Sequence, residues 1–429
     1  MTKLSTTQYV RTLLEEQKQR LQCQFVPRDI KFSGIGNKIE VAIGMRRSGK
    51  TCTLIQEMQH LQTQGLPVEQ MLYLSLDDDR IEPNNLATVA DIVDQFYALF
   101  PNNHQQLCHL FFDEVHTIEG WPRLIRRLHD TKKVKLWLSG SSAKLLSSEI
   151  ATELRGRSLA TCVWPYSFNE WLRARGEEPQ QPIFWGRPSL DYFKQRLTWY
   201  MQYGGFPEVL MLDAGQRVSV LQNYVEVVIF RDVVERYHIK NLSAARYLIK
   251  TLLRNISRPF SIHKVYNDLR SQGRRIAKDT LYEYVSYFED AFLCFAIEQH
   301  HSSTRKAEVT PKKVYAIDPG LVAAFLPSDT CDLGRRFENL VYLDLRRAGA
   351  TVSYYNTNDN EVDFVIKWPQ GKVELMQVCW DIYDSNTYKR EETALKQVQA
   401  ELGVSGTLLT VENYLQWIVK IAQSSSKNS

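Results

Sequence analysis

The chain has 429 residues, of which 44% are hydrophobic, and it carries 53 Lys and Arg against 49 Asp and Glu. This length predicts roughly two to four domains, and a net charge of +4 neither requires nor excludes a nucleic-acid partner. Seven cysteines without a C-x-x-C pair argue against a disulfide scaffold or a zinc site, and the lack of an apolar run of spanning length leads us to expect a cytoplasmic protein with no membrane partner.

Residues 5–24 predict an amphipathic helix, and short apolar runs then alternate with amphipathic segments from 38 to 167. The runs are apolar almost throughout, as in strands that are buried on both faces, so they predict an α/β fold with a largely parallel sheet and helices on both faces. The expected strands are 38–44, 71–80, 107–115, 134–142 and 158–167. We therefore expect an amino-terminal helix within 1–30 and an α/β domain over 31–175.

The first strand runs into the motif Gly44-x-x-x-x-Gly49-Lys50-Thr51, and a helix follows it. Glycines let the backbone curl so that its N–H groups face a phosphate, while Lys50 reaches the outer phosphates and the Thr51 hydroxyl binds Mg²⁺. A chance match is the alternative, but a strand before the motif and a helix after it favour a P-loop. The predicted ATP-binding residues are Gly44, Arg46, Arg47, Ser48, Gly49, Lys50, Thr51 and Cys52. The two arginines either stabilise the loop or touch phosphate.

A second motif is the acidic pair Asp113-Glu114, which ends the apolar strand "HLFFDEV". An aspartate at the end of a buried strand can hold Mg²⁺ through water, and the adjacent glutamate can orient and deprotonate an attacking water. An exposed acidic pair after a strand is the alternative. Together the two motifs predict that the protein binds ATP with Mg²⁺ and hydrolyses it.

The fourth strand ends in Ser139, Ser141 and Ser142, whose hydroxyls we expect near the γ-phosphate, although serine also simply ends strands. Arg155 and Arg157 follow in "ELRGRS". Either could act as an arginine finger, in the same chain or across a subunit interface, and a surface role is the alternative.

Six segments together resemble a widespread bacterial and archaeal AAA+ ATPase family that joins a P-loop domain to a carboxy-terminal domain of unknown function. The segments are "GMRRSGKT", "FFDEVHTIEGW", "LSGSSAKLLSSEIATELRGRS", "WPYSFNEWL", "YGGFPEV" and "VIFRDVVERY", and the resemblance runs from about 25 to 415. It implies an AAA+ core in which the Asp113 strand and the serine-ended strand flank the P-loop strand. It also implies that Ser141 is the sensor and that Arg157, in "LRGR", is the better finger candidate.

After a polar segment near 176–188, the chain reads as mostly helical, with a helical lid or linker over 189–240 and a winged-helix domain over 241–325. Three helices, at 244–257, 261–273 and 277–291, precede two apolar runs that we expect to be the wing strands. Between Lys240 and Lys313 there are fourteen basic and seven acidic residues, so this segment is basic while the rest is net acidic. The expected DNA contacts are Arg270, Arg274, Arg275, Lys278, Arg305 and Lys306. A protein-contact module with a solvated basic face is the alternative.

Residues 332–422 have the order of a PD-(D/E)xK nuclease core, a small α/β restriction-endonuclease-like domain, and 423–429 read as a disordered tail. Glu338 on a helix and Asp363 on a strand would hold Mg²⁺, but Gln377 and Cys379 stand where acid-x-lysine is expected. Lys372, Lys389 or Lys396 could supply the missing lysine from elsewhere. We predict a module that has lost nuclease activity and retains DNA affinity or a docking role.

The sequence thus predicts an AAA+ ATPase whose nucleotide state controls a winged-helix module and a nuclease-like module that act on DNA. Two alternatives stay open. One is a slow nucleotide-gated switch that recruits a protein partner with little turnover, and the other is an ATP-controlled nuclease. A homo-oligomer would be needed if the finger acts across subunits.

Overall fold

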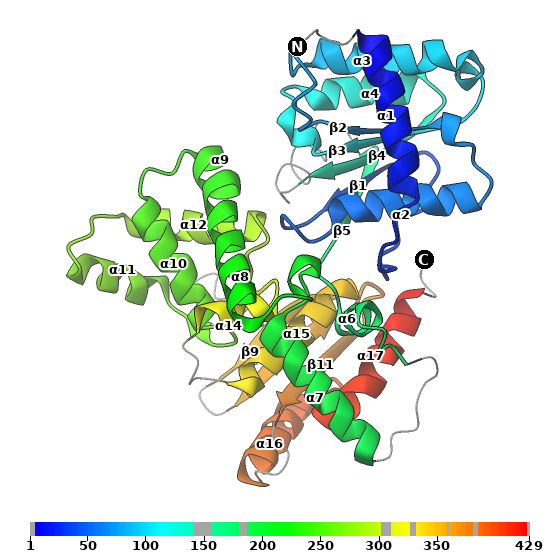
Figure 1. Ribbon diagram of the computed structural model, residues 1–429. Helices are drawn as coiled ribbons and strands as arrows, with labels where there is room; N and C mark the ends of the chain where they lie inside the picture. Colours follow the sequence, from blue (N-terminus) through cyan, green and yellow to red (C-terminus); the bar gives the residue numbers. More distant parts are fainter. Residues whose placement is uncertain are drawn as a thin grey trace. The chain divides into compact units, whose positions relative to one another are not determined.

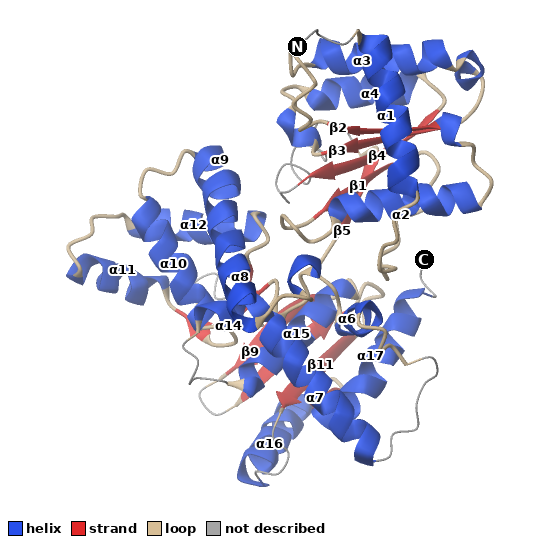
Figure 2. Cartoon of the chain, in the orientation of Figure 1, coloured by secondary structure: helices blue, strands red, loops and turns tan. Residues whose placement is uncertain are grey.

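A computed structural model describes residues 5–140, 154, 156–179, 187–301, 310–326, 332–357, 360–380 and 385–426 (Figures 1 and 2). The chain forms two compact units, Met1–Trp164 and Pro165–Ser429, so the first unit ends some ten residues before the boundary expected at 175. Among the described residues, no helix combines the length and the apolar character that crossing a membrane requires.

The first unit contains a parallel five-stranded sheet in the order β2-β3-β4-β1-β5. The strands are β1 (Ile39–Ile43), β2 (Met71–Ser75), β3 (Cys108–Asp113), β4 (Val134–Gly140) and β5 (Ser158–Cys162). Every residue of β1 and β3 is buried, because helices cover both faces of the sheet. The helices are α1 (Thr6–Leu21), α2 (Lys50–Thr63), α3 (Leu86–Leu99) and α4 (Trp121–Thr131). This is the P-loop α/β fold that the alternating pattern predicts.

The strand order corrects one expectation. The P-loop strand β1 lies between β4 and β5, and the Asp113 strand β3 pairs with the other side of β4. The serine-ended strand therefore flanks β1 as expected, but the Asp113 strand does not. Helix α2 packs against both β1 and β4, so its first turn still faces the end of β3.

Helix α1 belongs to this unit and covers the exposed edge of the sheet. Edge strand β2 would otherwise leave backbone groups unpaired. The Gln17 side chain satisfies two of them, donating to the carbonyl of Met71 (3.1 Å) and accepting from the N–H of Tyr73 (2.8 Å). This contact holds β2, and with it Tyr73, in register beside β3.

The second unit begins with a run of helices, and α14 (Pro319–Phe325) packs against the two longest of them. The run consists of α6 (Phe168–Ala174), α7 (Arg187–Tyr203), α8 (Ala214–Val228), the π-helical segment Ile229–Val234 and α9 (Glu235–Tyr237). Asp318 caps α14 by accepting from the N–H groups of Gly320 and Leu321, and it also accepts from the N–H of Gly205. A Cβ on Gly204 would lie 2.1 Å from the Asp318 carboxylate, so the "YGG" segment needs glycine where it meets this cap.

A three-helix module (residues 242–316) follows. Its elements are α10 (Leu242–Arg254), β6 (Pro259–Phe260), α11 (Ile262–Ser271), α12 (Lys278–Asp290), β7 (Cys294–Ile297) and β8 (Lys312–Ala316). The strands form an antiparallel sheet in the order β6-β8-β7. Buried apolar side chains recur along α10 at Ala244, Ala245, Leu248, Ile249 and Leu252, as an amphipathic helix on a core requires.

The chain ends in a carboxy-terminal sheet module (residues 333–426). Its elements are α15 (Leu333–Arg347), β9 (Thr351–Asn356), β10 (Glu361–Lys367), β11 (Val373–Cys379), α16 (Ser385–Leu402), β12 (Gly406–Thr410) and α17 (Val411–Ser426). The sheet order is β12-β11-β10-β9, with β11 and β12 parallel and the other pairs antiparallel. A bridge between Gln299 and Tyr354 joins this sheet to the end of β7.

Candidate functional site

The turn between β1 and α2 curls as a phosphate-binding loop must. Gly44 has a φ of 155°, and a Cβ there would lie 2.3 Å from the carbonyl oxygen of Val163. Gly49 has a φ of 102°, which is left-handed and strained for any residue with a side chain. The two glycines therefore stand where the backbone admits no other residue without distortion.

Lys50 begins α2 and turns back over this loop. Its side chain is buried, and its Nζ donates to the carbonyl oxygens of Gly44 and Met45, each at 3.1 Å. The hydroxyl of Ser48 is also buried and has no hydrogen-bond partner within the described part of the chain. A cationic group and a donor without a partner at a helix start fit an oxyanion such as phosphate.

Thr51 and Asp113 lie in direct contact at the mouth of this loop. The Thr51 hydroxyl donates to Asp113 Oδ2 at 2.6 Å, and Tyr73 on β2 donates to the same oxygen at 2.7 Å. The Ser139 hydroxyl bonds to Asp113 Oδ1. Three strands and one helix thus hold a carboxylate that is only 2% exposed. Hydroxyl and carboxylate oxygens are the donors that Mg²⁺ prefers, so these residues fit that ion.

Glu114 follows Asp113 in a left-handed conformation, with a φ of 54°. Its N–H donates to the Ser139 hydroxyl (3.0 Å), and its Oε2 lies 3.2 Å from Nδ1 of His116. Burial raises the pKa of Glu114, the nearby Lys50 lowers it, and the Asp113 carboxylate raises it. The balance is a pKa above the ordinary value, which makes the ionised carboxylate a stronger base.

The remaining loop residues differ in exposure. Arg47 is exposed, with a φ of 67°, whereas Arg46 is half-buried and close enough to Glu114 to lower its pKa. Cys52 is half-buried, and burial raises the pKa of its thiol, so the thiol stays protonated at neutral pH. Arg46 is therefore the better placed of the two arginines to influence the site.

Two residues of this site carry no signal in the sequence. Tyr73 contacts Asp113 as described above. Arg28 donates to the carbonyl of Ser48 (3.1 Å) and to the carbonyl of Trp164 (2.6 Å), so it ties the P-loop to the segment after β5. Neither belongs to a motif, and only the fold brings them here.

The other two predicted catalytic residues are Ser141 and Arg157. Ser141 lies outside the described residues. Arg157 directly precedes β5, at the amino-terminal ends of the parallel strands, where its carbonyl accepts from the N–H of Ile39 (2.8 Å). Its Nε lies 3.2 Å from Asp130 Oδ1. The P-loop follows the carboxy-terminal end of β1, about 13 Å away along that strand. This separation disfavours a finger within the same chain and leaves the other arrangement expected from the sequence, a finger that acts across a subunit interface.

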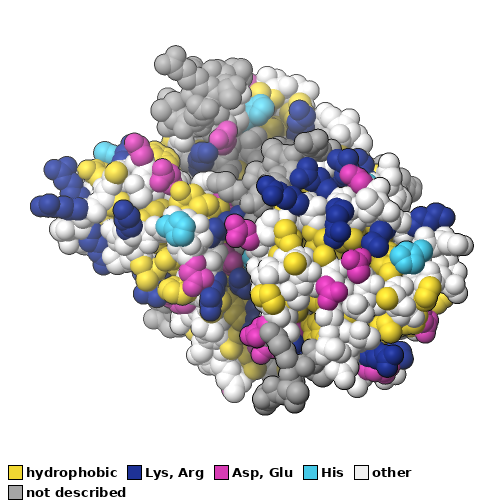
Figure 3. Space-filling model, turned by 90° about the horizontal axis from the view of Figure 1, so that it is seen from above, with side chains coloured by type: hydrophobic (Ala, Val, Ile, Leu, Met, Phe, Trp, Pro, Cys, Tyr) yellow, Lys and Arg dark blue, Asp and Glu magenta, His cyan; other side chains and the backbone are white. Residues whose placement is uncertain are grey.

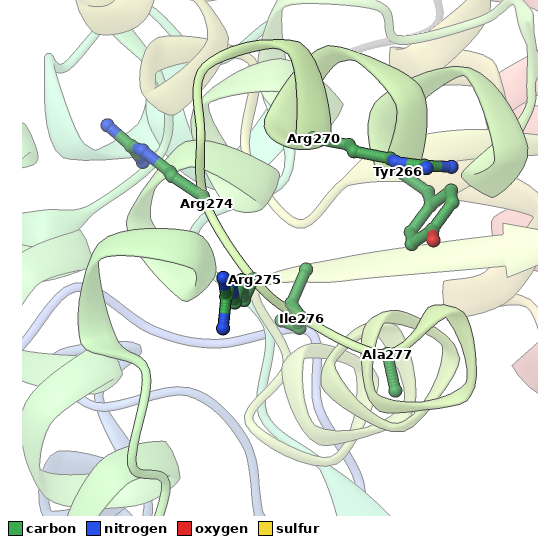
Figure 4. Close-up of a pocket in the computed structure, with 6 residues that line it drawn as sticks. All are labelled: Tyr266, Arg270, Arg274, Arg275, Ile276 and Ala277. Carbon is green, nitrogen blue, oxygen red and sulfur yellow. The ribbon is translucent and has the colours of Figure 1, made fainter.

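Three of the expected DNA contacts line one pocket in the second unit (Figure 4). This arginine pocket has a volume of about 470 Å³ and is formed by Tyr266, Arg270, Arg274, Arg275, Ile276 and Ala277. Figure 4 shows Arg270 beside Tyr266 on α11, with Arg274 and Arg275 on the loop that leads to α12. Lys and Arg side chains also gather at the outer end of the three-helix module in the space-filling view (Figure 3). Lys278 does not line the pocket, and Arg305 and Lys306 lie outside the described residues.

The nuclease-like positions also come together, but with an unexpected partner. Glu338 on α15 and Asp363 on β10 both contact Lys313 of β8, at 3.4 Å and 3.1 Å. Gln377 on β11 accepts from the N–H of Asp363 at 3.0 Å. The lysines proposed from the sequence lie elsewhere, since Lys372 pairs with Glu374, Lys396 pairs with Glu392, and Lys389 is exposed. The lysine of this cluster is therefore Lys313.

Known protein families match parts of both units. A family model described as an AAA domain matches residues 36–172, and one described as a domain of unknown function (DUF8612) matches residues 194–332. An uncharacterized protein of Methanocaldococcus jannaschii, MJ1544, is 31% identical over 401 residues, which cover 92% of this chain and 86% of the relative. An uncharacterized protein of Haemophilus influenzae is 27% identical over 353 residues, covering 82% of this chain and 85% of the relative.

Solved structures that match the chain include a Walker-type ATPase of Pyrococcus abyssi, with a TM-score of 0.42 and 14% identity over 72% of this chain and 95% of that one. They also include the ORC1 protein of Aeropyrum pernix in complex with DNA, with a TM-score of 0.29 and 13% identity over 74% of this chain and 90% of that one. Both whole-chain superpositions are loose.

Proposed function

Because the chain belongs to the family of AAA-domain proteins that includes MJ1544 of Methanocaldococcus jannaschii, with which it shares 31% identity, we propose that it binds and hydrolyses ATP at the site formed by Lys50, Thr51, Asp113 and Glu114. The observation that carries this proposal is the 2.6 Å contact between Thr51 and Asp113 beside the buried Lys50. Mg²⁺ bound there would neutralise charge on the phosphates and draw the outer phosphate into line for attack.

The residues of the site divide the work of hydrolysis. The loop N–H groups and Lys50 bind and orient the phosphates, which lowers the barrier mainly through positioning and charge neutralisation. Glu114 holds the attacking water and accepts its proton, a role that its raised pKa supports. Tyr73 and Ser139 keep the Asp113 carboxylate in one orientation, in which it would hold Mg²⁺.

We further propose that the nucleotide state controls the second unit, which acts on nucleic acid. The three-helix module has the helix, strand, helix, helix, strand, strand order of a winged helix, and its sheet order of β6-β8-β7 suits that assignment. The arginine pocket at the turn into α12 would bind backbone phosphates through its guanidinium groups. Phosphate contacts position a duplex without reading its sequence, so this part of the surface supplies affinity rather than specificity.

Arg157 is proposed as a finger that acts on a neighbouring copy of the chain. Its guanidinium is about one-third exposed and pairs only with an exposed carboxylate, that of Asp130, among the contacts described for its side chain. It would be free to exchange that partner for a phosphate at a subunit interface. Mixing Arg157→Ala with Lys50→Ala protein tests this, because one intact composite site would form and restore part of the turnover.

The experiment that tests the proposed function is ATP turnover by the full chain with and without duplex DNA. We expect turnover that requires Mg²⁺ and rises when duplex is added. Tight ATP retention with negligible turnover would instead favour a nucleotide-gated switch that recruits a protein partner. A turnover rate that duplex DNA does not change at low or moderate salt would contradict the DNA part of the proposal and leave only the ATPase activity.

A further inference from the structure

Lys313 is a buried cation that no step of the proposed ATP chemistry uses. It lies on β8 of the three-helix module, and its side chain is only 1% exposed. Its Nζ lies 2.7 Å from Glu361 Oε1, 3.1 Å from Asp363 Oδ1 and 3.4 Å from Glu338 Oε1. We call these three carboxylates the acid cluster. All three belong to the carboxy-terminal sheet module, so the lysine reaches into the cluster from a neighbouring module.

Glu338 and Asp363 of the acid cluster stand where a nuclease of this order would hold Mg²⁺, but the residues around them do not fit a divalent ion. Glu338 Oε1 accepts from the Tyr315 hydroxyl (2.7 Å), and Asp363 Oδ2 accepts from the N–H of Val378 (3.1 Å). The Gln377 carbonyl is taken by the N–H of Asp363, and its amide donates to Glu391 (2.6 Å). A divalent metal needs about six oxygen ligands around an open centre. Here an ammonium group stands among the oxygens instead.

We propose that the Lys313 ammonium is the resident cation of the acid cluster, that it excludes divalent metal from it, and that it locks the three-helix module to the carboxy-terminal sheet module. The nuclease-like module is then a structural and binding element that performs no metal-dependent cleavage. ATP hydrolysis would move the two modules together, as one body.

The charges of the cluster suit one monovalent cation. Burial and the neighbouring Asp363 carboxylate together raise the pKa of Glu338 to about 8, against the opposing effects of Lys313 and Tyr315. Burial alone would lower the pKa of Lys313, but the three carboxylates outweigh it and keep the ammonium charged. Lys313 therefore stays positively charged over the whole physiological range.

Two further contacts join the same pair of modules. Asn339 on α15 accepts from the N–H of Ala316 (2.7 Å) and donates to its carbonyl (3.1 Å), so it pairs with the backbone of β8 beside Lys313. Tyr354 on β9 pairs with the chain after β7, accepting from the N–H of His300 (2.6 Å) and donating its own N–H to Glu298 (3.1 Å). These contacts join the same two modules as Lys313 does.

The test is Mn²⁺ binding by the full chain without nucleotide, followed by electron paramagnetic resonance, for the wild type, Lys313→Met and Lys313→Met/Asp363→Asn. Comparing the wild type with Asp363→Asn alone shows whether the wild type binds Mn²⁺ at the acid cluster. Lys312→Met is the matched control, because Lys312 neighbours Lys313 on β8 but pairs with Glu298. We expect no Asp363-dependent Mn²⁺ in the wild type or in Lys312→Met. We expect such binding to appear in Lys313→Met and to disappear in the double variant.

Asp363-dependent Mn²⁺ binding by the wild type, or its absence from a folded Lys313→Met protein, would overturn the proposal. If Lys313→Met alone does not fold, the double variant decides, because it removes one charge of each sign. A folded double variant supports charge pairing between the two residues. A double variant as unfolded as the single one contradicts it.

Discussion

The Thr51 hydroxyl donates a 2.6 Å hydrogen bond to the Asp113 carboxylate, although 62 positions separate the two residues in the chain. The contact brings the start of α2 to the end of β3, across the strand β4 that lies between β1 and β3. A hydroxyl and a buried carboxylate, both of a kind that Mg²⁺ prefers, thus meet beside the P-loop. The predictions for the first unit follow from this contact between Thr51 and Asp113.

Replacing Glu114 by Gln should abolish most turnover while leaving ATP binding intact. The amide keeps the shape of the side chain but cannot accept a proton from water. General-base catalysis contributes about 10²- to 10⁴-fold, so we expect a loss of that size in kcat. Steady-state turnover and ATP titration of the same preparation measure the two effects. A variant that keeps wild-type kcat would remove Glu114 from the mechanism.

The pH dependence of turnover should report the environment of Glu114. Only the ionised carboxylate acts as a base, and burial raises its pKa above the ordinary 4.5. Activity should therefore fall on acidification, beginning at a higher pH than an exposed glutamate would give. The residual activity of Glu114→Gln is the control, since protonation of ATP itself affects both proteins. Identical acid limbs in the two profiles would contradict the assignment.

Local pattern was enough to predict much of the fold and the position of the P-loop between its strand and its helix. Strands buried on both faces leave unbroken apolar runs, and P-loop chemistry requires glycines and Lys50 within a few residues of one another. The acidic pair at Asp113 likewise marks its own strand end. The five strands and the loop therefore follow from neighbours in sequence.

Long-range placement could not be predicted in the same way. The pairing of the strands decides that β4 lies between β1 and β3. It also decides that Arg157 lies at the amino-terminal ends of the strands, away from the P-loop. Lys313 lies 25 positions from Glu338 and 50 from Asp363, and it reads in the sequence as one basic residue of a strand. Its role appears only when two modules pack together.

Replacing Tyr73 by Phe should weaken the response to Mg²⁺ without unfolding the protein. The change removes one hydrogen bond to Asp113 Oδ2 and keeps the buried ring. A bond of this kind contributes about 1 kcal/mol or somewhat more, so the Mg²⁺ concentration for half-maximal turnover should rise about fivefold or more. Tyr97→Phe is the matched control, a buried tyrosine with no bond to Asp113. Equal Mg²⁺ curves for the two variants would leave Tyr73 a packing role only.

Neutralising the arginine pocket should weaken duplex binding in a salt-dependent way. Each lost phosphate contact reduces the slope of log affinity against log salt by about 0.9. Arg270→Gln, Arg274→Gln and Arg275→Gln combined should therefore bind less tightly and give a shallower slope than the wild type. A variant carrying Lys372→Gln and Lys396→Gln removes charge from the carboxy-terminal sheet module and should bind as the wild type does. An unchanged slope in the triple variant would place the phosphates elsewhere.

Measuring Mg²⁺–ATP binding and turnover by Lys50→Ala tests the proposed ATP site most directly. Lys50 is buried over the P-loop carbonyls, and its ammonium is the charge that the loop offers to the outer phosphates. Lys18→Ala, on the exposed face of α1, is the control and should behave as the wild type. We predict that Lys50→Ala loses at least about tenfold in affinity and nearly all turnover while its thermal melt stays close to that of the wild type. A folded Lys50→Ala protein that binds and hydrolyses ATP normally would show that the nucleotide binds somewhere else.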